Sequence, residues 1–224
     1  MYRVVYENAN TLIIDKLVPV PTLRQGSNGG LSDEVLLEFP YLAGIKDCGF
    51  THRLDNETLG LLLIAKNEKY YLKMRELFSD KNISKIYLAR VRGQVPAEKG
   101  IIDTPIAHSA KSTKKMVAVK EGYRIFRGSP RDAVTAWNVV NRRTDSTDLE
   151  LSAKTGVRHQ IRVHLASIEH PICGDRLYGK YTEVDDCPSL MLISKSLSFI
   201  CPESGNQVDA ISTLTLDSMF GYIR

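Results

Sequence analysis

Short runs of apolar residues recur along the chain, and most of them have the length of a β-strand. Tyr2–Glu7 and Thr11–Asp15 lie on either side of an Asn-rich turn and predict two short strands. Leu59–Lys66 is apolar almost throughout, as expected for a strand that is buried on both faces. Further strands or core segments are predicted at Lys85–Gly93, Met116–Val119, Ala133–Val140, Leu149–Ala153, Leu190–Ile193 and Leu197–Ile200.

Helical spacing of apolar residues is confined to a few segments. In Asn67–Phe78 the apolar residues recur every three or four positions, and Val157–Glu169 has the pattern of a second amphipathic helix. Ser32-Asp33-Glu34 predicts a short capped helix that ends near Pro40. Predicted strands outnumber helices, and most connections are too short for a parallel crossover. We therefore expect an α+β fold with a mainly antiparallel sheet.

The composition fits an ordinary globular protein and excludes a disordered or collagen-like chain. The chain has 224 residues, of which 43% are hydrophobic and 25% charged. No linker is evident, so we expect a single domain over residues 1–224. No apolar run approaches the roughly 18–20 residues of a membrane span. The amino terminus lacks an apolar signal core and the cysteines are scattered, which predicts a cytoplasmic protein with reduced thiols.

The net charge of +4 is unevenly distributed along the chain. The segment His108–Arg127 has a local charge of +5, because its many lysines and arginines are opposed by Glu121 alone. Such a concentration of positive charge can attract a polyanion, although a solvated hairpin would show the same pattern. The basic residues of this segment are Lys111, Lys114, Lys115, Lys120, Arg124 and Arg127.

A first polar cluster, Thr51–Gly60, comes directly before the apolar strand segment. It places the carboxyl group of Asp55 close in sequence to His52 and Arg53. A carboxylate that is fixed at the end of a strand can act as a nucleophile or a base, and a nearby guanidinium would keep it ionised. Residue types and spacing alone favour a different interpretation, a turn in which Asp55 caps local backbone amides.

A second polar cluster, Thr155–His164, opens the predicted helix at Val157–Glu169. Helical spacing puts His159 and Arg162 on one face, and the helix amino terminus could receive a phosphate. A polar helix face with its own ion pairs is the alternative interpretation. The histidine spacings in this region match no common helical metal-ligand pair, so no metal site is predicted.

A third cluster, His170–Gly179, contains proline and glycine and predicts a tightly turned loop in which Asp175 and Arg176 could form a structural pair. Taken in order, the clusters are much more specific than any one of them. The chain contains HRLD-x-x-T-x-G-LLL-x-AK, K-x-Y-L-A-x-V-x-G, TG-x-x-HQIR-x-H and HPI-x-GD-x-x-YG. These motifs resemble those of the RluA-type pseudouridine synthases, and the resemblance covers most of the chain.

The resemblance implies an isomerase that converts uridine to pseudouridine in ribosomal or transfer RNA, on an α+β fold whose central, mainly antiparallel sheet is flanked by helices and loops. By motif position, Asp55 is implied as the catalytic aspartate and Tyr87 as the tyrosine that packs on the target uracil. Arg162 is implied as the basic residue that pairs with the aspartate. Arg53 is implied as the residue that fills the gap left by the departing base.

The reaction makes sense of these residue types. The target nucleotide must leave its stack, and the uracil must then detach from C1′, rotate and reattach through C5. The carboxylate could attack C1′ or remove the 2′ proton, and the sequence does not choose between these routes. The resemblance implies no metal and no organic cofactor. RNA contacts are expected from Arg53, His52, Arg158 and His159, and from Lys111, Lys114, Lys115, Lys120 and Arg124.

The sequence departs from the family pattern at Asp15-Lys16-Leu17, Thr58-Leu59-Gly60 and Thr155-Gly156-Val157, which bears on RNA contacts more than on the reaction. An S4-like RNA-binding domain is not expected, so recognition would rest on the catalytic domain. We expect a monomer with no membrane association and no obligate protein partner. Two other functions stay open: an RNA-binding or folding factor that has lost catalysis, and a glycosidase, which would need a second carboxylate partner for Asp55.

Overall fold

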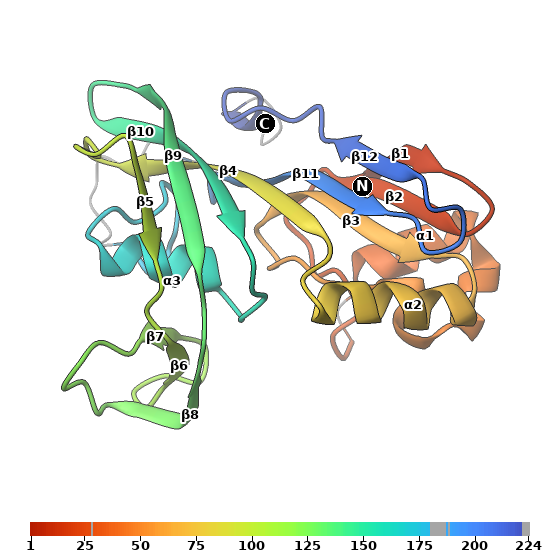
Figure 1. Cartoon of the computed structure of the whole chain (residues 1–224), viewed down its shortest axis with the longest axis horizontal. Coiled ribbons are helices and arrows are strands. Elements are labelled where there is room, and N and C mark those ends of the chain that lie inside the picture. Colours follow the sequence, from red (N-terminus) through yellow and green to blue (C-terminus); the bar gives the residue numbers. More distant parts are fainter. Residues whose placement is uncertain (28, 180–186, 188, 221–224) are drawn as a thin grey trace. The chain divides into compact units, whose positions relative to one another are not determined.

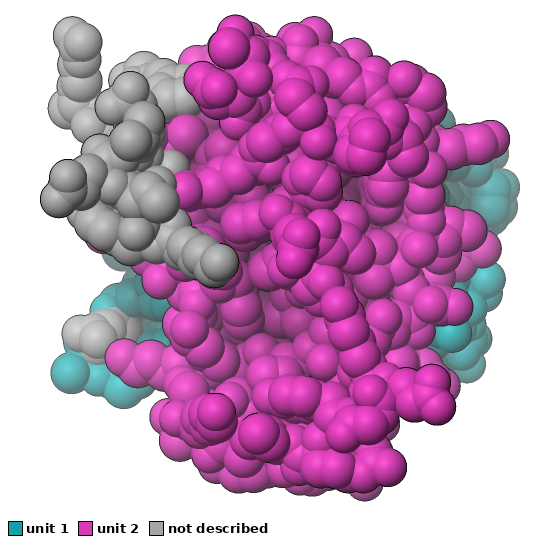
Figure 2. Space-filling view, turned by 90° about the vertical axis from the view of Figure 1, so that its left-hand side faces the viewer, with its two compact units in different colours: residues 1–85, 193–215 teal, residues 86–192, 216–224 magenta. Residues whose placement is uncertain are grey.

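The computed structural model describes residues 1–27, 29–179, 187 and 189–220, and the chain divides into two compact units. Unit 1 comprises Met1–Lys85 and Ile193–Thr215, whereas unit 2 comprises Ile86–Leu192 and Leu216–Arg224. Figure 2 shows the two units in different colours. The expectation that residues 1–224 act as one catalytic domain stays a prediction.

A mainly antiparallel sheet forms the core of unit 1. Strands β1 (Tyr2–Glu7), β2 (Thr11–Lys16) and β3 (Leu59–Ala65) are successive antiparallel neighbours. Strand β11 (Leu192–Ile200) pairs in parallel with β3 and antiparallel with β12 (Gln207–Ile211). Every residue of β2 and β3 is buried, which explains the almost continuous apolar composition of β3.

Helices accompany this sheet on the segments that the sequence indicates. Helix α1 (Leu31–Glu38) begins at the cap residue Gly30, whose amide donates to the Asp33 carboxylate, so Ser32 lies inside the helix. Helix α2 (Glu68–Ser79) follows β3 directly, and the Asn67 side chain caps it by accepting from the Tyr70 amide. It runs along the sheet of unit 1 (Figure 1). The 3₁₀ turns η1 (Pro40–Gly44) and η2 (Lys46–Gly49) connect α1 to the next loop.

Antiparallel strands also form the core of unit 2. Strand β4 (Ser84–Arg92) enters this unit from unit 1, and its neighbours follow in the order β4-β10-β9-β5. These strands are β10 (Ser146–Ala153), β9 (Thr135–Arg142) and β5 (Lys99–Ile102). A short 3₁₀ turn, η3 (Ser218–Phe220), lies near the end of the described chain.

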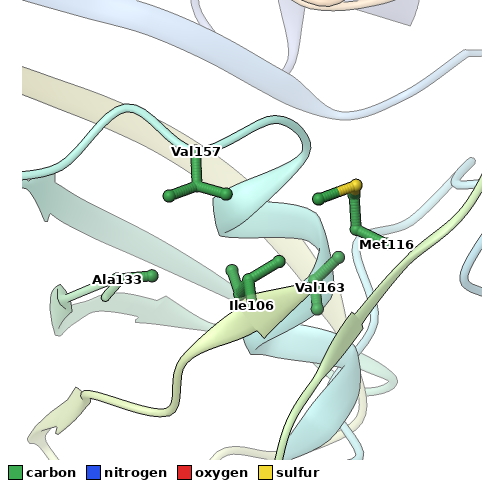
Figure 3. Close-up of a cluster of buried hydrophobic side chains, with 5 residues drawn as sticks. All are labelled: Ile106, Met116, Ala133, Val157 and Val163. Atoms are coloured by element: carbon green, nitrogen blue, oxygen red, sulfur yellow. The ribbon is translucent and has the colours of Figure 1, made fainter. Parts of the chain in front are cut away.

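A separate small sheet in unit 2 packs against α3 (Gln160–Ser167). It has three strands in the order β7-β6-β8, namely β6 (Ile106–Ser109), β7 (Met116–Ala118) and β8 (Phe126–Arg131). Buried apolar side chains from this sheet, α3 and the neighbouring loops meet in one cluster (Figure 3). Its members are Ile106, Met116, Ala133, Val157 and Val163.

The sequence-based prediction of an α+β fold with mainly antiparallel strands is confirmed. Two details differ. Leu190–Ile193 and Leu197–Ile200 belong largely to one strand, β11, and α3 is shorter than predicted because it begins at Gln160 and ends at Ser167. No helix in the described part of the chain is long and apolar enough to cross a membrane.

Candidate active site

The Asp55 carboxyl group is carried by a tight turn that comes immediately before β3 in unit 1. The Asp55 carbonyl oxygen accepts a hydrogen bond from the Thr58 amide at 3.0 Å, which closes the turn. The side chain of Asp55 is half-buried. Two residues into β3, Gly60 has a φ of +104° and pairs with Ser194, whose carbonyl oxygen would lie 2.3 Å from any Cβ at this position. The glycine of the HRLD-x-x-T-x-G motif therefore allows β11 to approach the strand that follows the turn.

Lys16, the last residue of β2, hydrogen-bonds to the backbone of this turn. Its ammonium group donates hydrogen bonds to the carbonyl oxygens of Asp55, at 3.1 Å, and of Asn56, at 2.7 Å. Lys16 has no exposed surface. Burial lowers the pKa of Lys16 to about 7, and the charge of Asp55 opposes this shift. A buried ammonium group that hydrogen-bonds to two backbone carbonyl oxygens fixes the geometry of the loop that contains them.

Sequence reasoning gave Lys16 no role and treated its surroundings only as a departure from the family pattern. A signal was nevertheless present. Thr11–Lys16 is an apolar strand that ends in Asp and Lys, and all six of its residues are buried. A lysine in such a strand must find acceptors inside the protein. Which carbonyls it would find was not predictable, because Asn56 lies 40 positions further along the chain.

Other side chains anchor the rest of the turn. The Thr22 hydroxyl accepts from the Leu54 amide at 3.2 Å and donates to the Leu54 carbonyl oxygen at 3.1 Å. The Thr51 hydroxyl donates to the Leu63 carbonyl oxygen at 2.9 Å, and Arg75 donates to the Thr51 carbonyl oxygen at 3.0 Å. The backbone on both sides of Asp55 is therefore fixed by hydrogen bonds to the strand and to α2, as a preorganised catalytic side chain requires.

His52 is one of these anchors. Its Nε2 atom accepts a hydrogen bond from the Leu63 amide at 3.0 Å, and its ring lies 4.7 Å from the Phe78 ring, centroid to centroid. Burial lowers the pKa of His52 to about 3, and the charges of Lys85 and Arg75 act in the same direction. A neutral His52 thus attaches the turn to β3. Its expected contact with RNA stays a prediction, as does that of Arg53, which is exposed.

Tyr87 and Arg162 lie in unit 2. Tyr87 is in the middle of β4, half-buried and opposite Leu151 of β10. Arg162, in the first turn of α3, is only 4% exposed. Its Nε and Nη2 atoms donate to the two carboxylate oxygens of Asp175 at 2.8 and 2.9 Å, a bidentate ion pair. The expected pair between Asp175 and Arg176 is therefore not the one that forms.

Asp175 organises the loop that supports Arg162. Its Oδ1 atom also accepts from the amides of Leu177, at 2.9 Å, and Tyr178, at 3.0 Å. Burial alone would raise the pKa of Asp175, but the hydrogen bonds and charge of Arg162, together with these amides, lower it. The carboxylate therefore stays ionised and holds the plane of the Arg162 guanidinium group.

His159 does not share a helix face with Arg162, contrary to expectation. It has a left-handed φ of +56° and is the cap residue that precedes α3. Its Nδ1 atom lies 2.7 Å from the Tyr178 hydroxyl. The Val157 amide just before the helix donates to the Gln160 side chain at 3.1 Å, so the protein caps this amide itself. That amide is therefore not available to bind a phosphate.

The expected RNA-contacting lysines, with Arg124 and Arg158, lie in unit 2 around its small sheet. Lys111, Lys114 and Lys115 are exposed in the turn between β6 and β7, which we call the lysine turn (residues 110–115). Arg158 is exposed and donates to the Lys114 carbonyl oxygen at 3.4 Å. Lys120 and Arg124 are exposed between β7 and β8. Lys120 donates to the carbonyl oxygen of Ser167, the last residue of α3, at 2.8 Å.

Histidine ligation of a metal was considered from the sequence. In the structure, the ring of buried His164 hydrogen-bonds with its Nδ1 atom to the Thr135 hydroxyl and with its Nε2 atom to the Thr104 carbonyl oxygen, both at 2.9 Å. Among the described residues there is no group of three or more His, Cys, Asp or Glu side chains placed to hold a metal ion. His164 thus serves to join α3 to β9 and to the loop before β6.

Comparison with known proteins identifies the class to which this fold and these motifs belong. A family model described as RNA pseudouridylate synthase matches residues 10–167. The chain therefore belongs to the RNA pseudouridylate synthase family, which confirms the resemblance found in its motifs. The solved structure of human RNA pseudouridylate synthase domain containing 1 superposes with a TM-score of 0.79 over 96% of this chain and 84% of that chain, at 24% identity. That likeness shows a shared fold.

Curated relatives are more similar in sequence. An uncharacterized RNA pseudouridine synthase of Aquifex aeolicus is 34% identical over 219 residues, which are 91% of this chain and 66% of the relative. A protein named ribosomal large subunit pseudouridine synthase D, of Nitrosomonas europaea, is 33% identical over 182 residues, or 80% of this chain and 50% of the relative. The chain thus spans about half to two thirds of the length of these relatives.

Proposed function

We propose that the chain isomerises specific uridines in RNA to pseudouridine. The observation that carries this proposal is the Asp55 turn: a half-buried carboxylate on a backbone that Lys16, Thr22 and the Thr58 amide hold in place. A catalytic carboxylate must be fixed relative to the sugar that it acts on, because small misplacements are costly in rate. Membership of the RNA pseudouridylate synthase family supports the same assignment.

In the proposed reaction the N1–C1′ bond of uridine breaks, the uracil rotates, and a C5–C1′ bond forms. The C5 proton passes to solvent and N1 gains a proton, so the reaction conserves all atoms and involves no oxidant or hydrolysis. Asp55 either attacks C1′ or takes the 2′ proton. Tyr87 presents an aromatic face for the flipped uracil, and Arg162 supplies positive charge for the Asp55 carboxylate. No metal or organic cofactor takes part.

Charge and the relatives support the proposed substrate class. Ribosomal or transfer RNA is proposed as substrate, since one relative is named for the ribosomal large subunit. Exposed lysines of the lysine turn, with Lys120, Arg124 and Arg158, would contact backbone phosphates, and Arg53 would occupy the gap in the base stack. We further propose that the protein acts in the cytoplasm as a monomer without an obligate protein partner.

The test is to incubate the purified chain with transcribed ribosomal and transfer RNA and to analyse the digested RNA by mass spectrometry and pseudouridine mapping. The proposal predicts pseudouridine at a few defined positions with no release of free uracil. Release of uracil would indicate the glycosidase instead. RNA binding without either product would indicate a folding factor, and absence of both binding and product on all RNAs would contradict the proposal outright.

A further inference from the structure

The side chain of Tyr178 joins parts of unit 2 that are distant in sequence. Its hydroxyl oxygen accepts a hydrogen bond from the Met116 amide at 2.9 Å and lies 2.7 Å from Nδ1 of His159. The guanidinium carbon of Arg162 lies 5.3 Å from the centre of the Tyr178 ring, within the range of a cation–π contact. One residue therefore touches the small sheet, the cap of α3 and a residue of the candidate site.

The contact with Met116 fixes the lysine turn. Met116 is the first residue of β7, and β7 is an edge strand that pairs only with β6 among the described strands. Edge strands leave amides unpaired, and the Tyr178 hydroxyl satisfies one of them with a side chain from another loop. A hydroxyl group has two lone pairs and one proton, so it can serve Met116 and His159 together.

The contacts on the other side of Tyr178 fix Arg162. The Tyr178 amide donates to Asp175, and the same Asp175 carboxylate holds Arg162 in the bidentate pair. The Tyr178 ring and the Asp175 carboxylate belong to the same loop, and both contact the Arg162 guanidinium group. The ring does so through its face. Arg162 and the lysine turn consequently share a single support.

We propose that Tyr178 is a positioning residue that sets where the lysine turn binds RNA relative to Arg162. This inference rests on the proposed function, because it assigns the lysine turn to RNA. The two ends of the side chain have separable effects. The hydroxyl preorganises the lysine turn, and so governs affinity for RNA, whereas the ring and the loop orient Arg162, and so govern the rate on bound RNA.

The separation is tested with Tyr178→Phe, which loses the hydroxyl and keeps the ring, and Tyr178→Leu, which loses both. Tyr70→Phe is the matched control, because the Tyr70 hydroxyl is likewise hydrogen-bonded, to Thr11 at 2.9 Å in unit 1. The measurements are Kd for a transcribed substrate RNA, KM and kcat for pseudouridine formation, and amide hydrogen exchange in peptides that cover residues 110–118.

For Tyr178→Phe we expect faster exchange at residues 110–118 and a Kd and KM raised about three- to tenfold, as for one lost hydrogen bond, with kcat within about twofold of wild type. Tyr178→Leu should lower kcat as well, by about tenfold or more. Tyr70→Phe should change none of these quantities. A kcat that is lost in Tyr178→Leu but kept in Tyr178→Phe, while KM is raised in both, is a result that a merely structural tyrosine would not give.

An unchanged Kd and unchanged exchange in Tyr178→Phe would overturn the inference. So would equal losses of kcat in the phenylalanine and leucine variants, since the two ends of the side chain would then not be separable. If the wild-type chain binds RNA but forms no pseudouridine, the proposed function fails, and the Kd and exchange data alone decide the role of Tyr178. A wild-type chain that binds no RNA would overturn the inference whatever its exchange behaviour.

Discussion

The ammonium group of Lys16 lies 3.1 Å from the backbone carbonyl oxygen of Asp55, and it is buried. The contact joins the end of one core strand to the turn that carries the candidate catalytic carboxylate. Because the ammonium group also binds the next carbonyl, at Asn56, it defines the path of the backbone through the turn. The position of the Asp55 side chain thus depends on a residue outside its own motif.

Lys16→Met should therefore lower kcat by about tenfold or more while the protein stays folded. Methionine has a similar length and no charge to bury, but it leaves the two carbonyls without their donor. Lys66→Met is the matched control, because the Lys66 ammonium group also donates to a backbone carbonyl, that of Asn8, at 3.0 Å. The measurement is kcat on saturating RNA, and a wild-type kcat in Lys16→Met would remove this lysine from the account.

His52 gives the stability of the fold a defined dependence on pH. Its pKa in the folded state is about 3, whereas the ordinary value in an unfolded chain is about 6.5. Between these values the unfolded chain binds a proton that the folded chain does not, so stability falls as the pH falls below about 6.5. At pH 5 the loss from this one group is about 2 kcal/mol.

The measurement is urea unfolding at pH 7 and pH 5 for wild type and His52→Gln. Glutamine can still accept a hydrogen bond from the Leu63 amide but does not titrate. The free energy of unfolding should therefore decrease less in the variant than in wild type over this interval. Equal decreases in the two proteins would show that His52 takes up its proton in the folded state as well.

Arg162 should not be replaceable by another cation. Arg162→Lys keeps the charge but loses the bidentate contact with Asp175, so we expect kcat to fall about tenfold or more. Arg176→Lys is the matched control, since Arg176 is exposed and its neighbour Asp175 is committed to Arg162. Steady-state kinetics on saturating RNA distinguish them. A lysine variant that works like wild type would mean that only charge matters here.

The lysine turn predicts a salt signature. Changing Lys111, Lys114 and Lys115 to Gln should weaken RNA binding on all sequences, and each lost phosphate contact should reduce the slope of log Kd against log salt by about 0.7–0.9. The measurement is RNA titration at several salt concentrations. Lys46, Lys69 and Lys81, exposed in unit 1, provide a control triple variant of equal charge. A slope that changes equally in both triple variants would indicate that only net charge acts.

The sequence predicts those elements whose pattern is local. Strand β3 is an apolar run interrupted only by Gly60, and α2 has helical spacing, so the sequence predicts both close to their observed bounds. Strand β8, Phe126–Arg131, was not expected. It contains Gly and Pro, and all its residues but Phe126 are exposed, so no alternation marks it. It forms because β6 offers a ladder of hydrogen bonds, which is a property of the folded sheet.

The candidate site was predictable only as far as its motifs reach. Asp55, Tyr87 and Arg162 were found by motif, but the pairing of Arg162 with Asp175 crosses from a helix to a loop. The left-handed backbone of His159 was not predictable for a different reason. Residues other than glycine rarely adopt that backbone conformation, and the sequence instead suggests an ordinary helical position. Such relationships depend on where separate segments meet, and a linear pattern does not encode this directly.

The central claim, that the Asp55 carboxylate isomerises uridine, is tested most directly by tritium release. RNA labelled at C5 of uridine loses its tritium to water when C5 bonds to C1′. Asp80, an exposed carboxylate at the end of α2, provides the control. We predict that Asp80→Asn releases tritium at a rate similar to that of the wild-type chain. Asp55→Asn should bind the RNA but release no tritium above background. Tritium release by Asp55→Asn at a rate close to that of the control would contradict the claim.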